Sequence, residues 1–543
     1  MEYCRAVRVA PARFSQRSCI IARMDLVPEP KAYASLPGSL DLREGALVRG
    51  SGELAEVAEL AASWCGEAFS LNGIAPRFSA AQAGAPPEGA AAIDFILDPG
   101  LPAEDYALSI AKGGIEARSG GREGAVHAAA TLRQLLLSEG AVLPCLRIED
   151  GPRFPWRGAM LDCARNFFRP EFIERFIDLM ALHKLNRFHW HLTDDQAWRL
   201  ELSRHPELAL LGSTRQDRRY CEKMLKSGSY SPDDVSRIVS YAAARGIVVV
   251  PEIETPGHVV ALLASHPELS CRGHAEDGGA FLPEDRYGVF EDVLCAGNDK
   301  VFDLLGEVYD EVAGLFPGPW VHAGGDEVPK ARWRECPTCR TRMEREGLFS
   351  ARGELDPERL QGWFMNRAAE ALAERGKRML GWDEILDGHV RKDAVILSWR
   401  GREGGIRAAR EGYDAVMSPQ GHACYLDHKN FDSPEEPGNL GFCTTAESYA
   451  FDPVPTELSS DEAEHILGGQ ANIWTEFMYF GRNVEYMAFP RLCALSEVFW
   501  SPKEKRDFEG FERRMKAHGA RLDLLGVNRY RGPYKADSNG LHA

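Results

Sequence analysis

Short apolar runs alternate with helical stretches from Trp156 onwards. The runs are strand-sized and predict eight β-strands, at residues 158–162, 187–192, 247–253, 320–323, 378–382, 395–399, 415–418 and 466–473. Strands that alternate with helices are typical of a parallel sheet with helical crossovers. Eight such units over roughly 350 residues predict an α/β fold, a (β/α)8 TIM barrel.

Helical periodicity is clearest between the first two predicted strands. One mostly apolar face is formed there by Phe172, Phe176, Leu179, Met180 and His183. Pro170 stands near the first turn of this helix, where proline is tolerated. Further helices are predicted at residues 233–245, 300–315, 358–375, 404–411 and 485–495.

The chain before the barrel has a different pattern. It is rich in Ala, Gly and Glu, and predicts helices at 53–69 and 123–138, a strand at 93–97 and a glycine-turn hairpin within 106–119. The turn-rich segment 149–155 marks a boundary. We therefore expect a small α+β domain at 24–150 and the barrel at 151–530.

Residues 1–23 contain five arginines, two cysteines and no continuous apolar segment, which is unlike a secretory signal. We expect a disordered lead or a mis-set start codon, with a transit peptide as the alternative. The corresponding localisation is cytoplasmic, or secreted if the start is mis-set.

The charge and composition of the chain exclude several kinds of partner and protein class. The net charge of −17 repels phosphate backbones, so we expect no nucleic acid partner, and it disfavours strongly anionic glycans. No apolar run reaches the 18 or so residues that a membrane helix needs, so we expect no membrane span. Thirteen scattered cysteines in a chain of 543 residues are unlike a disulfide scaffold.

Chemically active side chains follow the predicted strands, at the end of a barrel where active sites lie. In chain order they are Arg165, then His189, His191, Asp194 and Asp195, then Glu252, Glu254 and His258, then His322, Asp326 and Glu327, then Trp382, Asp383 and Glu384, then Trp399, Tyr425, Asp427, Trp474 and Glu476. The tryptophans suit the apolar face of a sugar ring, and carboxylates with arginine suit its hydroxyls. Asp326 and Glu327, after Gly324-Gly325, supply two carboxylates at one strand end.

These residues stand in blocks that resemble glycoside hydrolase family 20, the β-N-acetylhexosaminidases. The blocks, in family order, are Asp162-Cys-Ala-Arg165, 184–196, Glu254-Thr-Pro-Gly-His258, His322-Ala-Gly-Gly-Asp326-Glu327, Gly381-Trp-Asp-Glu384, Ser398-Trp-Arg400, Tyr425-Leu-Asp427 and 468–476. They span residues from about 150 to 500, and the preceding segment resembles the family's N-terminal domain.

The resemblance implies exo-acting, retaining hydrolysis of terminal β-linked N-acetylhexosamine, with the substrate's acetamido oxygen as nucleophile and an oxazolinium intermediate. It implies that Glu327 is the general acid and base, that Asp326 holds the acetamido N–H, and that Tyr425 orients the acetamido oxygen. Asp194 and His258 would lie behind Glu327. The remaining implied residues bind the sugar: Trp382, Trp399 and Trp474 enclose it, and Arg165, Asp427 and Glu476 grip its hydroxyls. No cofactor and no metal is implied.

For several residues the sequence leaves both a structural and a functional interpretation open. Asp195 and Asp383 are caps or functional groups, and His189 and His191 are interpreted as core histidines beneath the pocket. Cys336-Pro-Thr-Cys339 is a lone pair of cysteines after the fourth strand, and no second pair stands near it in the sequence. Since zinc needs four ligands, we expect a free, exposed pair, with a metal site or a disulfide as the alternative.

Two other functions compete with the glycosidase. His189-x-His191, with His258 and Asp326, could ligate a metal in a sugar deacetylase of the amidohydrolase type. A carbohydrate-binding protein without catalysis is the other alternative. We expect N-acetylhexosaminide oligosaccharides or glycoconjugates as partners and a monomer or homodimer. GlcNAc against GalNAc preference, linkage and sulfation are not predicted.

Overall fold

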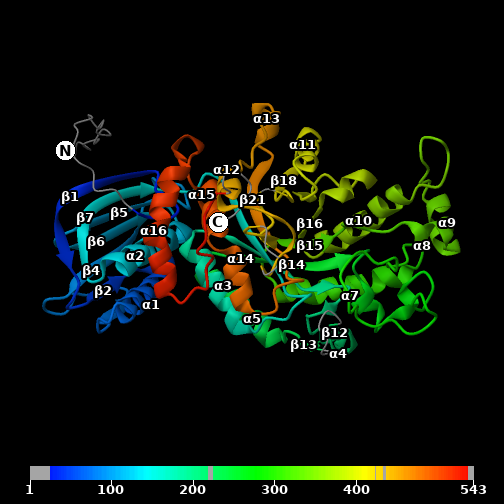
Figure 1. The fold of residues 1–543 in the computed structure, drawn as a ribbon, viewed down its shortest axis with the longest axis horizontal. Helices are drawn as coiled ribbons and strands as arrows, with labels where there is room; N and C mark the ends of the chain where they lie inside the picture. Colours follow the sequence, from blue (N-terminus) through cyan, green and yellow to red (C-terminus); the bar gives the residue numbers. More distant parts are fainter. Residues whose placement is uncertain (1–24, 218–223, 422, 432–435, 536–543) are drawn as a thin grey trace, which may run out of the picture.

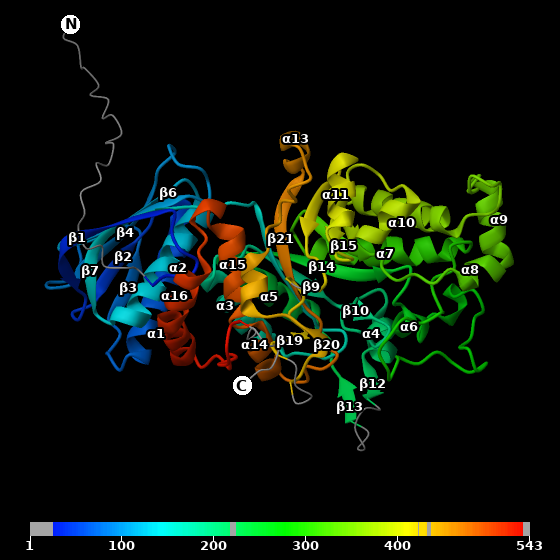
Figure 2. The ribbon, with the colours of Figure 1, turned by 45° about the horizontal axis from the view of Figure 1, so that its top comes forward.

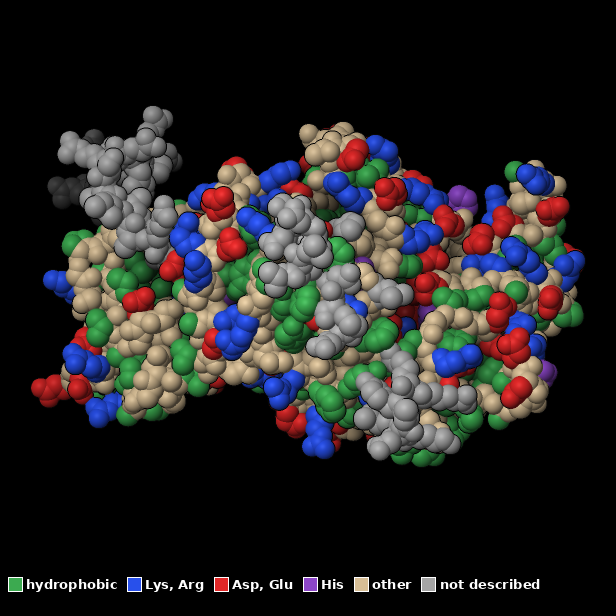
Figure 3. Space-filling view, in the orientation of Figure 1, with side chains coloured by type: hydrophobic (Ala, Val, Ile, Leu, Met, Phe, Trp, Pro, Cys, Tyr) green, Lys and Arg blue, Asp and Glu red, His purple; other side chains and the backbone are tan. Residues whose placement is uncertain are grey.

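The computed structural model describes residues 25–217, 224–421, 423–431 and 436–535. The predicted lead at 1–23 lies outside these residues. The two-part organisation is visible in Figures 1 and 2, where a sheet with its own helices stands beside a larger barrel. Among the described helices, none is both long enough and apolar enough to cross a membrane. Acidic and basic side chains are interspersed over the face shown in Figure 3.

The N-terminal part is a seven-stranded mixed sheet in the order β1-β7-β5-β6-β4-β2-β3. Its strands are β1 (Ala32–Asp41), β2 (Ala46–Arg49), β3 (Phe78–Ala81), β4 (Ala91–Leu97), β5 (Tyr106–Ala111), β6 (Gly114–Ser119) and β7 (Val142–Asp150). The predicted hairpin is confirmed as the antiparallel pair β5–β6. Two helices pack on this sheet and on each other, α1 (Ala55–Leu71, after the 3-10 turn Gly52–Leu54) and α2 (Arg122–Glu139).

All eight predicted barrel strands are confirmed, and they close in the order β14-β15-β16-β17-β18-β21-β8-β9. Their bounds are β8 (Trp156–Asp162), β9 (Arg187–His191), β14 (Val248–Thr255), β15 (Trp320–Gly324), β16 (Arg378–Trp382), β17 (Val395–Ser398), β18 (Asp414–Met417) and β21 (Ile466–Ile473). Every neighbouring pair is parallel. Parallel closure puts all eight carboxyl ends at one rim of the barrel.

Helices surround this barrel at the predicted positions. The crossover helices are α3 (Pro170–Leu182), α5 (Pro232–Ala244), α7 (Asp299–Leu315), α10 (Pro357–Ala373) and α11 (Glu403–Arg410), and α14 (Gly481–Ala488) and α15 (Arg491–Trp500) follow the last strand. The single helix predicted at 485–495 is wrong, because the chain breaks between α14 and α15 at Phe489-Pro490. Proline has no N–H to donate and disfavours a helical residue before it.

Shorter elements fill the connections. They are β10 (Thr193–Asp194), β11 (Ala197–Trp198), α4 (Pro206–Gly212), β12 (Thr214–Asp217), β13 (Met224–Ser227), α6 (Val260–Leu263), α8 (Ala331–Glu335), α9 (Pro337–Arg345), β19 (His428–Lys429), β20 (Asn439–Phe442), α12 (Thr445–Ala450) and α13 (Ser460–Ala463). Short 3-10 turns lie at Pro267–Leu269, Asp383–Gly388 and Lys503–Lys505. The last helix, α16 (Phe508–Leu524), lies between the N-terminal sheet and the barrel in Figure 1.

Candidate active site

A pocket opens at the carboxyl-terminal rim of the barrel. Its volume is about 120 Å³, and its lining consists of Arg165, Asp326, Glu327, Trp382, Trp399, Gln420, Tyr425, Asp427, Asn439, Trp474 and Glu476. Nine of these eleven side chains are site residues predicted from the sequence, and Gln420 and Asn439 are new. Residues separated by more than 300 positions therefore meet in one place.

Asp326 and Glu327 directly follow two glycines whose backbone conformation other residues rarely adopt. Gly324 and Gly325 have φ angles of 72° and 99°, and a Cβ on Gly325 would lie 2.4 Å from Ile385 Cγ2. Glu327 itself is in the left-handed region at φ 47°, which is uncommon for a residue with a side chain. Its backbone N–H donates to both carboxylate oxygens of Glu384 at 3.1 Å. This turn aims Asp326 inward and leaves Glu327 at the rim, with side chains 12% and 41% exposed.

His258 lies behind the carboxylate pair. Its Nε2 is 3.7 Å from Asp326 Oδ2 and 3.5 Å from Glu327 Oε2. Its Nδ1 is 2.8 Å from Asp195 Oδ2 and 3.5 Å from Asp194 Oδ1. Burial lowers the pKa of His258, but these carboxylates outweigh it and raise the pKa well above the usual value. A protonated imidazole therefore faces the pair.

Asp194 also forms an ion pair with Arg165 in the pocket. Arg165 Nη2 lies 2.8 Å from Asp194 Oδ2, and Arg165 Nε donates to Gln196 Oε1 at 2.9 Å. The guanidinium also lies 5.0 Å from the centroid of the Trp474 ring. Arg165 is therefore fixed by an ion pair, an amide and an aromatic face, which preorganises it for a ligand.

Glu252 holds the base of the pocket together. Its carboxylate accepts from Trp382 Nε1 at 2.9 Å and contacts all three strand-end histidines, His189, His191 and His322. These histidines are buried, so the interpretation of His189 and His191 as core residues is confirmed. Both histidines contact Glu252, a carboxylate for which the sequence predicted no role.

Trp399, Tyr425 and Trp474 form the aromatic wall with Trp382. The Trp399 and Tyr425 rings are stacked with centroids 6.5 Å apart, and the Trp382 and Trp474 rings are 5.9 Å apart. Burial raises the pKa of Tyr425 well above the usual value, so its hydroxyl stays a donor. The backbone of Tyr425 is held by a bridge to Asn472 on β21.

The buried carboxylates of the pocket are shifted toward their neutral forms. Burial raises the pKa of Asp326 to about 7, with Glu252 and Glu327 adding to the shift and His258 opposing it. Burial and the charge of Glu476 raise the pKa of Asp427 to about 8. Shifts of this kind are concentrated at functional sites.

Some polar atoms of the pocket find no protein partner. Within the described part of the chain, Asp326 Oδ1, Asp427 Oδ1 and Trp399 Nε1 are buried without a hydrogen bond. Unpaired buried polar atoms cost about 1–3 kcal/mol each, and a polar ligand would satisfy them. The pocket is therefore built to receive hydrogen-bonding groups.

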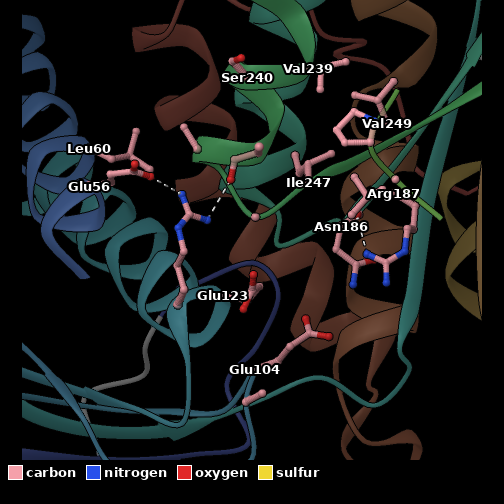
Figure 4. Close-up of a pocket in the computed structure, with 18 of the residues that line it drawn as sticks. Glu56, Leu60, Glu104, Glu123, Asn186, Arg187, Val239, Ser240, Ile247 and Val249 are labelled. Atoms are coloured by element: carbon pink, nitrogen blue, oxygen red, sulfur yellow. Dashed lines mark hydrogen bonds and ion pairs between the residues drawn. The ribbon is translucent and has the colours of Figure 1, made fainter. Parts of the chain in front are cut away.

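A larger pocket of about 1240 Å³ lies at the opposite end of the barrel (Figure 4). It separates α1 and α2 from the starts of β9 and β14, and is lined by Glu56, Glu123, Asn186 and Arg187 among others. The amino-terminal end of a barrel is associated with stability, whereas chemistry belongs to the carboxyl-terminal rim. Size alone would therefore point to the wrong cavity.

Three carboxylates beside the pocket had no role predicted from the sequence: Asp195 and Glu252, which are buried, and Glu384, which is half-buried. Asp195 contacts His258, and it also accepts from Val260 N at 3.1 Å, so it is a helix cap and a partner of the site at once. Glu252 and Glu384 lie near strand ends, and this position in the sequence could have pointed to them. Their partners, however, come from other strands and are distant in the sequence. Asp383 forms an ion pair with Arg400 at 3.2 Å and is not part of the pocket lining.

The expectation that Cys336 and Cys339 are exposed is wrong, although both are free of disulfides as expected. Both side chains are buried, and Cys271 and Cys295 lie beside them. The second pair exists in space because the long segment 266–298 folds back, which spacing along the chain does not reveal.

Comparison with known proteins assigns the chain to a family. The model for the catalytic domain of glycosyl hydrolase family 20 matches residues 154–503, and the model for domain 2 of that family matches residues 23–151. Fold and site thus define a glycosidase of the (β/α)8-barrel class. Within that class, the chain belongs to glycosyl hydrolase family 20.

Relatives carry consistent names. A β-hexosaminidase of Porphyromonas gingivalis is 42% identical over 80% of this chain, and the match spans only 56% of that protein's length. A β-N-acetylhexosaminidase of Cellulomonas fimi is 32% identical over 89% of this chain and 90% of its own. The solved exo-β-N-acetylglucosaminidase of Vibrio harveyi, in complex with N-acetylglucosamine, has a TM-score of 0.82 at 32% identity, covering 97% of this chain and 81% of that one.

Proposed function

We propose that the protein is an exo-acting, retaining β-N-acetylhexosaminidase that releases terminal β-linked GlcNAc or GalNAc. The observation that carries this proposal is the Asp326-Glu327 pair in a small pocket walled by tryptophans and Tyr425. The small size of the pocket suits a single terminal sugar, and the names of the relatives support the same substrate class.

The first step uses the substrate's own acetamido group. Its carbonyl oxygen attacks the anomeric carbon while the glycosidic bond breaks, and Glu327 gives its proton to the leaving oxygen. Asp326 accepts the acetamido N–H and stabilises the positive charge that develops on the oxazolinium ring. Tyr425 donates to the acetamido oxygen and so orients it, an effect of positioning.

The second step returns the enzyme to its starting state. Glu327, now a carboxylate, takes a proton from water, and the water oxygen attacks the anomeric carbon and opens the oxazolinium ring. The sugar keeps its β configuration because the carbon is inverted twice. Within this scheme His258, with Asp194 and Asp195 behind it, positions the carboxylate pair and sets its charge.

The tryptophans and the remaining polar groups provide binding. Trp382, Trp399 and Trp474 enclose the acetamido methyl and the sugar ring. Arg165, Asp427 and Glu476 bind ring hydroxyls, and the arginine is held ready by Asp194.

A leaving-group comparison tests the role of Glu327. We expect Glu327→Gln to lower kcat/KM by about 10²–10⁴-fold on a natural disaccharide and much less on a 2,4-dinitrophenyl glycoside, which needs little protonation. Glu335→Gln, an exposed residue of α8, is the control and should leave both rates unchanged. Equal losses on both substrates would refute the acid role.

A metal-dependent sugar deacetylase remains the second candidate, because His189, Glu252 and His322 lie within ligand distance of one another. Product analysis separates the two reactions: a deacetylase liberates acetate and leaves the glycosidic bond intact. The predicted cytoplasmic location and monomeric or homodimeric state stay proposals, to be checked by fractionation and light scattering.

A further inference from the structure

Four cysteines from three separate segments converge beyond the rim of the barrel. Cys271 follows the 3-10 turn after α6, Cys295 precedes α7, and Cys336 and Cys339 stand at the start of α9. The Sγ atoms of Cys295 and Cys336 are 3.7 Å apart, those of Cys295 and Cys339 are 3.5 Å apart, and those of Cys271 and Cys339 are 3.8 Å apart. One ligand atom from each residue lies within 4.8 Å of all the others.

These separations match the edges of a coordination tetrahedron. With metal–sulfur bonds of about 2.3 Å, tetrahedral geometry places the sulfurs about 3.8 Å apart. Two disulfides would instead pair the sulfurs at about 2.05 Å, whereas Cys295 and Cys339 each have two sulfur neighbours at similar distances. The arrangement is a shared centre and not two pairs.

The surrounding backbone is shaped for this centre. Cys336 is the N-cap of α9 and Cys339 lies in its first turn, where unpaired N–H groups and the helix dipole favour thiolates. A Cβ on Gly297 would lie 2.3 Å from the carbonyl carbon of Thr338, so only glycine lets the turn after Cys295 approach the Cys-x-x-Cys segment. Cys295, Cys336 and Cys339 are buried, and Cys271 is partly exposed.

We propose that Cys271, Cys295, Cys336 and Cys339 bind one structural Zn²⁺ as a tetrathiolate. Four protein ligands close the coordination sphere, so this metal has no open position for substrate or water. Binding releases the protons of those thiols that are still protonated and involves no change of oxidation state.

The site would fasten a long irregular segment. Between Cys271 and Cys295 the described backbone forms only isolated bridges and turns, among them the bridge of Ser270 to Leu294. This segment reaches the active site, because Glu284 N donates to Asp195 O at 2.9 Å and Arg286 O accepts from Gln196 Nε2 at 2.9 Å.

The metal would also join this segment to the loop that carries the carboxylate pair. Trp333 Nε1 on α8 donates to Leu294 O at 3.0 Å, and Arg332 on α8 lies 3.1 Å from Asp292. α8 and α9 stand at the end of the molecule farthest from the N-terminal sheet in Figures 1 and 2. A zinc ion there would hold the outer wall of the site against the barrel.

Metal analysis of the full chain, purified without chelators or added metal, tests this assignment. Elemental analysis should find about one zinc per chain, and X-ray absorption should give four sulfurs at about 2.3 Å. Iron at this stoichiometry, or disulfides revealed by four missing thiols in a denaturing thiol titration, would overturn it. Zinc below about 0.2 per chain with all thiols free would also overturn it, because tetrathiolate sites bind zinc tightly.

Substitutions localise the metal. Cys339→Ala should lose the zinc, lower the thermal midpoint and speed hydrogen exchange in residues 270–297, whereas Cys65→Ala, a buried cysteine of α1, should keep all the zinc. Cys271→Ala, at the partly exposed position, provides a second variant if Cys339→Ala fails to fold. Retention of one zinc in a folded Cys271→Ala or Cys339→Ala protein would place the metal elsewhere. These readouts do not depend on the proposed hydrolysis.

Discussion

At the scale of single residues, burial decides what the carboxylates of the pocket can do. Asp326 lies where solvent hardly reaches, and its pKa of about 7 means that the fold favours its neutral form. The acetamido N–H of a bound sugar, together with protonated His258, would favour the charged form again. The substrate therefore completes an electrostatic arrangement that is unfavourable without it.

Replacement of Asp326 by Asn should therefore stabilise the free enzyme while it removes activity. Unfolded aspartate titrates near 3.8 and folded Asp326 near 7, so wild-type stability falls as the pH rises from about 4 to about 7 and is level above that. We expect Asp326→Asn to gain on the order of 2–4 kcal/mol at pH 8, less at pH 5, and to lose roughly 10²–10³-fold in kcat.

Urea unfolding at pH 5, 6, 7 and 8 measures this gain, with the exposed Asp303→Asn as control. A gain in unfolding free energy that is the same at every pH would show that ionisation of the Asp326 carboxyl does not destabilise the fold. An unchanged kcat would remove Asp326 from the reaction centre.

Residue types at strand ends identified most of the pocket from the sequence. Tryptophan, tyrosine and paired carboxylates are chemically distinctive and stand directly after apolar runs. Asp195 was ambiguous because an aspartate in the loop after a strand can be a cap or a functional group, and Glu252 because its role depends on histidines of two other strands, β9 and β15. Gln420 lies in a loop and Asn439 begins the short strand β20, and no periodicity predicts where these segments run.

At the scale of elements, the turn after β15 connects the fold to the chemistry. The consecutive positive φ angles of Gly324 and Gly325 turn the chain so that the next two residues point to different sides of the pocket. The strands themselves were predictable since each is a compact apolar run between helices. In the N-terminal domain β1, β2, β3 and β7 were not predicted. Exposed positions break the apolar pattern of β1, β3 and β7, and β2 is a run of only four residues.

Gly325→Ala tests the turn. The new Cβ would meet Ile385 Cγ2 at 2.4 Å and adopt a strained φ, so we expect a loss of about 2–4 kcal/mol in unfolding free energy and a clear drop in kcat. Gly412→Ala is the matched control, since it has φ +77° with open space around it and should cost only about 1 kcal/mol. Equal costs for the two variants would mean that close packing at position 325 is unimportant.

At the scale of the whole molecule, the N-terminal domain is fastened to the barrel by buried polar groups. Asp150, the last residue of β7, pairs with Lys184 at 2.8 Å and accepts from Trp500 Nε1 at 3.0 Å. On α16, Arg521 donates to Gln134 O of α2 at 3.0 Å. We propose that the domains divide near residue 150, with 24–150 and 151–530 as the two units, and that this interface makes them unfold together.

The central claim is that the barrel cleaves a terminal N-acetylhexosaminide with retention through the acetamido group. Proton NMR of the hydrolysis of 4-nitrophenyl β-N-acetylglucosaminide tests it most directly, because it resolves the first anomer formed before mutarotation. We predict that β-N-acetylglucosamine appears first, with the acetyl group intact and no free acetate. Initial formation of the α-anomer, release of acetate with the glycosidic bond intact, or binding without turnover would contradict the account.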